Sequence, residues 1–400
     1  MKTLKTYFLS LVCILSVAVV LQPITTRAAV DRIEIDRRGG DPNAPIPIFL
    51  KGFSSETMGI LRFDLEVVGF EIVSAADAYY ELSGSIGTTL KAKLTGRGSS
   101  KALFHLDFEG ASRRHVHTLS DQVVKVVFDG QQKGIARTKI AFKVNFGKYS
   151  EIYLSDYDGN NMQQVTSDRS YSAAPCWVPG QMKLYYTSYK EVFPNIYSHD
   201  LITGVRHRIA KFPGLNTSPS ISPNAQFLAM ILSKNGSPDA YVSNLSGGNL
   251  TQLTRTKLEE ASPCWSPDSK RICFTSRQNG RPRLYTQSVG GGSMVRIPTS
   301  SGSAFEPDWS PDGKNIIYTI QSGRSFELWL VPVDAHGNPT GKSEFMTVGE
   351  DPSWAPNSRT VIFTRRDRNN RKLSLLDVKT KRVKYARIKS GKCSQPAWAQ

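Results

Sequence analysis

A turn motif recurs along the second part of the chain at a nearly constant interval, and this repeat limits the possible folds more than any other feature. The motif pairs a tryptophan, or its replacement, with a proline two residues later, as in DWSPDG at 308–313. Its prolines are Pro179, Pro223, Pro267, Pro311 and Pro356, which lie 44, 44, 44 and 45 residues apart. A fixed period of this length is typical of stacked copies of one structural unit.

A second marker runs in phase with the motif, 20 residues after each tryptophan position. It is an aromatic residue in an alternating strand pattern, at Tyr153, Tyr197, Tyr241, Tyr285 and Trp329, with Ser374 in the most divergent unit. In one unit, β-rich runs at 271–276, 284–289 and 294–297 are separated by polar or glycine-rich turns. Four antiparallel strands per unit of this length predict a β-propeller blade.

The two markers are offset at the ends of the repeat region, and the offset predicts how the ring closes. Tyr153 has no tryptophan motif ahead of it, whereas Trp398, 44 residues after Trp354, has no strand after it. We therefore expect residues 393–400 to be the first strand of the blade that begins at 138–166. This arrangement gives six blades and leaves no open sheet edge at the junction.

The motif itself predicts a turn with a buried aromatic residue beside it. Proline presets φ at the first turn position, and Gly313 permits positive φ at the fourth. The other copies must adopt that conformation with other residues, namely Gln181, Ala225, Ser269 and Ser358. The tryptophans, and Ile221 in the copy that lacks one, are expected to pack between neighbouring blades.

The first 28 residues have the pattern of a secretory signal peptide. Lys2 and Lys5 precede an apolar run from Tyr7 to Leu21, and small residues stand at Ala28 and Ala29, where cleavage is expected. The apolar run has about 15 residues, fewer than the roughly 20 that a membrane-spanning helix needs. We therefore expect an exported chain that is soluble after cleavage.

Residues 29–136 lack the repeat and predict a small α/β domain. Strands are expected at 31–38, 45–53, 79–86, 88–94 and 102–108 from their alternating apolar residues. One helix is expected from a Ser54 or Ser55 cap to Gly69, and a shorter one from a Ser120 cap to Gly130. The whole chain is thus predicted to be α+β and multidomain, with an N-terminal α/β domain at 29–136 and a closed six-bladed β-propeller at 137–400.

Positive charge is concentrated near the end of the chain. The net charge is +17, and the segment from Arg359 to Lys392 holds thirteen Lys or Arg and two Asp. For an exported protein we expect no nucleic acid; anionic envelope polymers, lipid headgroups or an acidic protein face are the plausible partners. A merely solvated basic face is the alternative. The candidate patch comprises Arg365, Arg366, Arg368 and Arg371.

Four cysteines follow the predicted signal peptide: Cys176, Cys264, Cys273 and Cys393. Four in so long a chain do not form a disulfide framework. Cys264 and Cys273 are predicted to lie on neighbouring strands. Free buried thiols are expected at all four positions.

No catalytic or metal-binding pattern stands out. The nucleophile elbow G-x-S-x-G, the zinc motif H-E-x-x-H and phosphate-binding loops are absent. His115 and His117 could share one face of a strand near His105, which is a weak metal signal. DYDGNN at 156–161 begins like a calcium loop but lacks its glycine and glutamate, so a hairpin turn is expected. No catalytic residue, cofactor or metal is assigned.

Together these features resemble the TolB family, the periplasmic component of the Tol-Pal system. The resemblance rests on the signal peptide, an α/β domain that opens VDRIEIDRRG, and six blades with WSPDG-like turns and IYLSDYDG-like strands. It covers the whole chain after residue 28 in the family's domain order. It implies a monomeric, non-enzymatic protein of the periplasm that meets membranes only through its partners.

The resemblance also implies the partners. Such proteins bind Pal, a peptidoglycan-associated lipoprotein, at the channel mouth of the propeller, and TolA through the N-terminal region, and so support outer-membrane invagination during division and envelope integrity. Other outer-membrane or peptidoglycan-associated proteins are further expected partners. The Pal-facing residues would be Leu215, Asn216, Thr217, Glu259, Glu260, Phe305, Glu306, Glu350 and Asp351. The TolA-facing strand would be Val30, Asp31, Arg32, Ile33, Glu34, Ile35 and Asp36.

Two other classes of function stay open. A propeller hydrolase or lyase would need a catalytic cluster at the channel. A basic propeller could instead bind anionic envelope polymer through its last complete blade.

Overall fold

The computed structural model describes residues 41 and 43–400, apart from 111, 369, 390 and 391. The expected signal peptide, its cleavage site at Ala28 and Ala29, and the strand Val30–Asp36 lie outside the described residues. Those three expectations stay predictions. No helix in the described part of the chain is both long and apolar enough to cross a membrane.

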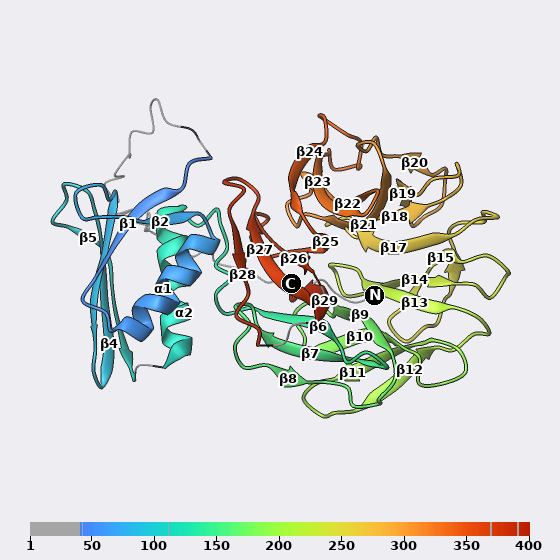
Figure 1. Cartoon of the computed structure of the whole chain (residues 1–400), viewed down its shortest axis with the longest axis horizontal. Coiled ribbons are helices and arrows are strands. Elements are labelled where there is room, and N and C mark those ends of the chain that lie inside the picture. The colour runs from blue at the N-terminus through green and yellow to red at the C-terminus, as the bar shows by residue number, and fades with distance from the viewer. Residues whose placement is uncertain (1–40, 42, 111, 369, 390–391) are drawn as a thin grey trace, which may run out of the picture. The chain divides into compact units, whose positions relative to one another are not determined.

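The N-terminal region forms a five-stranded sheet with two helices (Figure 1). Its strand order is β2-β1-β3-β4-β5, in which β1 runs parallel to β2 and β3 and the remaining pairs are antiparallel. The elements are β1 Ile46–Lys51, α1 Ser55–Val67, β2 Phe70–Ile72, β3 Tyr80–Ile86, β4 Thr89–Gly96, β5 Ala102–Glu109 and α2 Arg113–Val127. The α/β character expected for this region is confirmed.

Helix α1 begins and ends as its sequence predicts. The hydroxyl of Ser54 accepts the N–H of Thr57 as an N-cap, and Gly69 follows the C-cap with a φ of 100°. Leu61 and Leu65 lie on the buried face of the helix. The short parallel strand β2 was not predicted, because three residues are too few to display a period.

The prediction for the second helix was wrong. Helix α2 begins after an N-cap at Ser112, and Ser120 lies buried in its middle, where its hydroxyl donates to Asp64 at 2.8 Å. The first turn of α2, RRHV, is mostly polar, so its sequence does not show the apolar period that predicts a helix. The histidines therefore do not share a strand face: His117 is buried against Asp64 at 2.8 Å, and the His115 ring stacks on Phe108.

Six four-stranded antiparallel sheets form the propeller, and their first strands lie nearest its centre (Figure 1). Blade 1 is β9 Ser172–Trp177, β10 Lys183–Ser188, β11 Asn195–Asp200 and β12 Arg206–Ala210; blade 2 is β13 Asn216–Ile221, β14 Phe227–Leu232, β15 Asp239–Asn244 and β16 Thr251–Gln252. Blade 3 is β17 Glu260–Trp265, β18 Arg271–Ser276, β19 Arg283–Ser288 and β20 Val295–Arg296; blade 4 is β21 Ser303–Trp309, β22 Asn315–Ser322, β23 Ser325–Pro332 and β24 Glu344–Val348. Blade 5 is β25 Glu350–Trp354, β26 Thr360–Asp367, β27 Asn370–Asp377 and β28 Val383–Tyr385; blade 6 is β29 Cys393–Trp398, β6 Lys139–Asn145, β7 Ser150–Asp156 and β8 Gln163–Gln164.

The ring closes as predicted, through its own two ends. Blade 6 has the order β29-β6-β7-β8, so the last strand of the chain is the innermost strand of the blade that begins near residue 139. In this pairing Cys393 lies opposite Val144 and Trp398 opposite Ile140. The six-bladed propeller closed by pairing of its ends is therefore confirmed.

The tryptophans of the motif are buried between blades, also as predicted. The indole N–H of Trp177 donates to the carbonyl of Ala397 at 3.1 Å, and that of Trp265 donates to the carbonyl of Ser220 at 2.9 Å. Each acceptor belongs to the preceding blade. Ile221, which replaces tryptophan in blade 2, is buried in the apolar cluster between blades 1 and 2.

The turn after each tryptophan agrees with the prediction in all copies but one. Gly313, Ala225, Ser269 and Ser358 have φ values of 76°, 54°, 60° and 52° at the fourth turn position. In VPGQ of blade 1 the positive φ of 70° falls on Gly180 instead of Gln181. A glycine one residue earlier allows the type II form of the turn, so Gln181 avoids the strained conformation.

Candidate partner-binding face at the propeller channel

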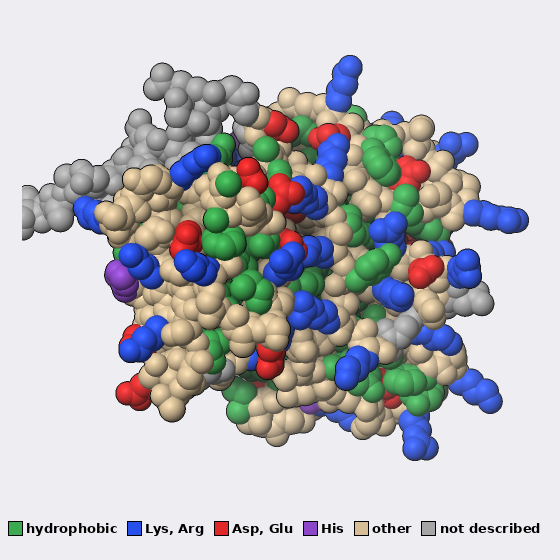
Figure 2. Space-filling view, turned by 60° about the vertical axis from the view of Figure 1, so that its left-hand side comes forward, with side chains coloured by type: hydrophobic (Ala, Val, Ile, Leu, Met, Phe, Trp, Pro, Cys, Tyr) green, Lys and Arg blue, Asp and Glu red, His purple; other side chains and the backbone are tan. Residues whose placement is uncertain are grey.

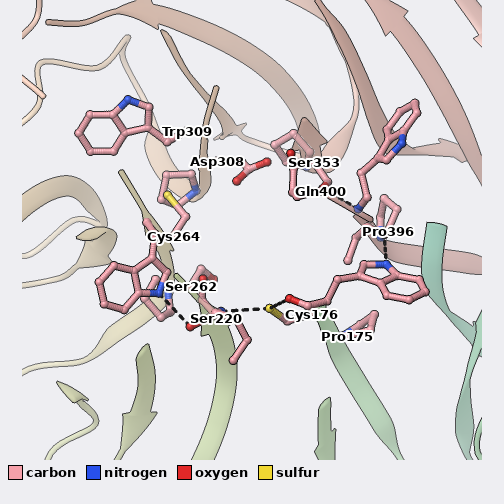
Figure 3. Close-up of a pocket in the computed structure, with 18 of the residues that line it drawn as sticks. Pro175, Cys176, Ser220, Ser262, Cys264, Asp308, Trp309, Ser353, Pro396 and Gln400 are labelled. Carbon is pink, nitrogen blue, oxygen red and sulfur yellow. Dashed lines mark hydrogen bonds between the residues drawn. The ribbon is translucent and has the colours of Figure 1, made fainter. Parts of the chain in front are cut away.

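The first strands of all six blades enclose a central channel. Its cavity has a volume of about 500 Å³ and is lined by the prolines of those strands and by the residues beside them. Cys176, Ser220, Cys264, Asp308 and Ser353 stand around the opening in Figure 3. The propeller axis is therefore a hollow with a largely apolar wall and a few polar groups, the kind of concave surface at which ligands and partner segments bind.

Every first strand contains the same backbone irregularity. A β-bulge interrupts its pairing with the second strand, and the residue before the proline has a left-handed backbone. The six residues and their φ values are Ala174 (49°), Ser218 (53°), Ser262 (49°), Glu306 (51°), Asp351 (53°) and Gln395 (51°). A bulge redirects the side chain that a regular strand would present, which brings these residues to the channel wall.

Side chains at this position link neighbouring blades through hydrogen bonds. The N–H of Asp351 donates to Glu306 Oε2 at 2.9 Å, and the N–H of Gln395 donates to Asp351 Oδ2 at 3.0 Å. The N–H of Ala174 then donates to Gln395 Oε1 at 3.1 Å. The chain of bonds runs through blades 4, 5, 6 and 1, so these side chains hold the blades in register.

Two carboxyl groups on the channel wall have raised pKa values. Burial, followed by the neighbouring Asp351 carboxylate, raises the pKa of Glu306 to about 8. Burial raises the pKa of Asp308 to about 7, although its Oδ2 accepts the N–H of Trp354 at 2.7 Å. Both carboxyls therefore ionise less readily than free ones, and the wall is less acidic than its sequence suggests.

Of the nine predicted Pal-facing residues, only Glu306 and Asp351 line the channel cavity, and few of the nine reach solvent. Glu259 is exposed, and Leu215 is 37% exposed. Glu260 is buried and accepts bonds from the Ser276 and Thr256 hydroxyls at 2.8 and 2.9 Å. Burial raises the pKa of Glu260 to about 7.

Three more of these residues serve the fold. Asn216 is fully buried and its amide N–H group donates to the carbonyls of Pro194 and Phe212, which ties two loops together. Thr217 and Phe305 are half-buried. Seven of the nine predicted residues lie within the first strands β13, β17, β21 and β25, and Leu215 and Glu259 lie directly ahead of β13 and β17. Their role toward a partner stays a prediction.

The predicted basic patch divides into two parts. The guanidinium group of Arg365 lies over the ring of Tyr385. Arg366, Arg368 and Arg371 instead line a second pocket of about 340 Å³, together with Asn145, Asn370 and Lys392. The pocket lies where the β26–β27 hairpin of blade 5 meets blade 6.

Much of the basic segment is neutralised by acids. Its paired cations and their partners are Arg359 with Asp377, Arg366 and Arg371 with Glu350, Lys372 with Asp367, Lys381 with Glu344, Arg382 with Glu71 and Lys384 with Glu66. On the face of the molecule that Figure 2 shows, Lys and Arg side chains are scattered, and Asp and Glu side chains lie among them. Within the described residues of this segment, the cations without an ion-pair partner are Arg365, Arg368, Lys379, Arg387, Lys389 and Lys392.

Sequence reasoning missed a group of exposed apolar residues in the turns of blades 6 and 1. They comprise Phe146, Tyr171, Tyr189, Val192 and Phe193, with exposed fractions of 46%, 47%, 44%, 93% and 47%. We call these five residues the aromatic patch. The signal for it was present: NFGKYS and YKEVFPN place aromatic residues in turns rather than at core positions of the repeat.

The aromatic patch is connected across two blades. The Phe146 ring stacks on Tyr149 at a centroid distance of 5.0 Å, within the β6–β7 hairpin of blade 6. The hydroxyl of Tyr171 donates to the carbonyl of Gly147 at 3.2 Å, and the N–H of Tyr189 donates to the carbonyl of Tyr171 at 2.8 Å. Exposed apolar groups clustered in this way mark interaction sites more often than scattered ones do.

The structure offers little for metal or redox chemistry. Within the described residues, no three His, Cys, Asp or Glu side chains are grouped so as to hold a metal ion. Cys264 and Cys273 lie opposite each other on β17 and β18, as predicted, and no disulfide joins any cysteines in the part of the chain that the structure describes. The sequence DYDGNN forms the expected hairpin turn between β7 and β8.

Comparisons with known proteins agree with this architecture. A family model described as the TolB β-propeller domain matches residues 130–400. Proteins named Tol-Pal system protein TolB from Ruthia magnifica and Francisella tularensis are 33% identical over 148 residues and 32% identical over 178 residues. These matches cover 36% and 42% of this chain, and only 34% and 41% of the length of the relatives.

A solved structure extends the likeness beyond the propeller. The crystal structure of TolB from Acinetobacter baumannii is 26% identical, has a TM-score of 0.79, and is covered over 96% of its length by 89% of this chain. That share includes more than the residues of the propeller alone. With an α/β region ahead of a six-bladed ring that its own last strand closes, the chain belongs to the TolB family.

Proposed function

We propose that the protein is a non-enzymatic binding component of the Tol-Pal system in the periplasm. In this proposal Pal binds at the channel mouth of the propeller, and TolA binds the segment Val30–Asp36. The complex supports outer-membrane invagination during division and the integrity of the envelope. Membership of the TolB family supports the system and the compartment, because the relatives are named as Tol-Pal system proteins.

The observation that supports a binding role most directly is the composition of three neighbouring hairpins, β26–β27, β6–β7 and β10–β11. Exposed aromatic residues and arginines lie in and beside these hairpins, and these residue types are enriched in protein interfaces. The wall carboxyls, in contrast, are engaged with backbone N–H groups and with hydroxyls. The arrangement suits recognition of a protein surface.

Two binding measurements test this proposal. The chain from Ala29 onward, titrated with the purified soluble domain of Pal in a calorimeter, is expected to bind it. Deleting residues 29–36 should abolish binding of the TolA C-terminal domain and leave Pal binding unchanged, because the deletion removes no residue of the propeller. The proposal is wrong if neither domain binds the full chain at concentrations up to about 1 mM, which corresponds to roughly −4 kcal/mol.

A further inference from the structure

The pocket between blades 5 and 6 has the properties of a preorganised anion site. We name it the arginine pocket and define it by Arg366, Arg368, Arg371, Lys392 and the amides of Asn145 and Asn370. It contains four cationic side chains and no acidic one among its lining residues. Asn and Arg side chains together supply N–H donors on several sides of a small cavity.

Two of its arginines are held in place from behind. The buried Glu350 carboxylate accepts Nε and Nη2 of Arg366, with the Nε contact at 2.7 Å, and lies 3.5 Å from Nε of Arg371. The Arg366 guanidinium also lies 3.8 Å above the Phe326 ring. Because these contacts fix the Arg366 guanidinium group, its side chain would lose little conformational entropy when an anion binds.

Holding two guanidinium groups with one carboxylate leaves an excess of positive charge in the pocket. Arg368 stands in the β26–β27 turn with a φ of 51°, and Lys392 is exposed just ahead of β29. Neither has an acidic partner among the described residues. Their charges are therefore available to a ligand.

The arginine pocket adjoins the aromatic patch. Asn145 lines the pocket and its side-chain oxygen accepts the N–H of Gly147 at 2.6 Å, so it also shapes the hairpin that carries Phe146. One ligand can thus cover cationic and apolar groups at the same time. Binding hot spots are built mainly from arginine and aromatic residues in such proximity.

We infer that the arginine pocket binds a carboxylate side chain of a folded protein partner, while an apolar segment of the same partner covers the aromatic patch. This inference rests on the proposed function, and it identifies where on the propeller the partner gains its affinity. A polyanion would require cations along an extended track. A polyanion also has no apolar groups with which to cover the exposed Phe146 ring beside the pocket.

Charge reversal at the two unpaired cations tests the inference. The double variant Arg368→Glu, Lys392→Glu should weaken binding of the Pal domain at least tenfold in low salt and flatten its dependence on salt concentration. The matched control is Arg324→Glu, because Arg324 is exposed in the equivalent β22–β23 hairpin of blade 4 and lies outside the pocket. The control should change the dissociation constant less than threefold. Far-UV circular dichroism verifies that each variant is folded.

The aromatic half of the inference has its own variant. Phe193→Ala should weaken binding severalfold with an unchanged salt dependence, because it removes apolar contact and no charge. Equal effects of the double variant and the control would overturn the inference while leaving the proposed function intact. A wild-type chain that binds no Pal would overturn the proposed function itself.

In that second case the pocket is tested with an acetylated hexaglutamate peptide and with polyphosphate. Pocket-dependent binding of the peptide supports carboxylate recognition by the pocket. If the chain binds polyphosphate more tightly than the peptide, and the double variant abolishes that binding, the pocket recognises an envelope polymer. That result would contradict carboxylate recognition. Binding of neither probe would also overturn it.

Discussion

Truncating the last tryptophan of the chain should destabilise the whole ring. Trp398 is 3% exposed, its indole N–H donates to the Thr138 hydroxyl at 2.8 Å, and its ring stacks on Tyr157. Replacement of a buried tryptophan by alanine costs about 3–5 kcal/mol. Thr138 keeps its bond to the carbonyl of Ile135, so Trp398→Ala leaves no additional unsatisfied polar group.

The expected loss can be converted into a melting temperature. For a domain of this size, each kcal/mol lowers the melting temperature by about 2–4 °C, so Trp398→Ala should melt about 10 °C below the parent. Deletion of residues 393–400 should lower it further, because it also removes the pairing with β6 and opens the ring. Far-UV circular dichroism during heating measures the melting temperatures of both variants.

Trp329→Ala is the matched control. It removes the same side chain from β23, where Trp329 is only partly buried and packs edge-on against Phe345. Its melting temperature should fall by less than half as much. A shift below about 3 °C for Trp398→Ala, or an equal shift for the two variants, would refute the reasoning that the C-terminal strand locks the ring.

Two further predictions concern groups on the channel wall. Because the pKa of Asp308 is raised to about 7, the folded state holds a proton that the unfolded chain has released, and stability should fall as pH rises from about 4 to about 7. Asp308→Asn should reduce that fall, as seen in urea midpoints at pH 5 and 7.5; an unchanged pH slope would contradict the assignment. Burial raises the pKa of the Cys176 thiol to about 12, and the other three described cysteines are buried. At pH 8 the native chain from Ala29 should therefore react with a thiol reagent at least a hundredfold more slowly than the guanidinium-unfolded chain, and a fast-reacting native thiol would count against this burial.

The repeat made the propeller predictable because each blade is specified locally. The period of about 44 residues puts each tryptophan, or its replacement, at the same position of its blade. An interpretation of one copy of the motif therefore applies to the others. The offset of Tyr153 and Trp398 was enough to predict the closing strand. Helix α2 was misplaced for the opposite reason, since it occurs once and its first turn is polar.

The candidate site was predicted less well, because spacing along a strand does not say which groups face solvent. Of the six residues directly before the first-strand prolines, only Glu306 and Asp351 were predicted as site residues, and both accept hydrogen bonds from the backbone of the next blade. Glu260 is likewise directed inward by hydroxyl partners that lie distant in the repeat pattern. The aromatic patch arises from three separate turns of two neighbouring blades, which the spacing along any one strand does not reveal.

The left-handed residue ahead of each proline has a consequence for how this channel can diversify. Six positions share one backbone conformation within 4° of φ, yet they hold alanine, serine, glutamate, aspartate and glutamine. The left-handed backbone at these positions therefore tolerates different side chains, while the chemistry of the channel lining depends on which side chains are present. A single replacement at any of the six alters the chemistry of one sixth of the wall, so specificity can evolve blade by blade with the scaffold unchanged.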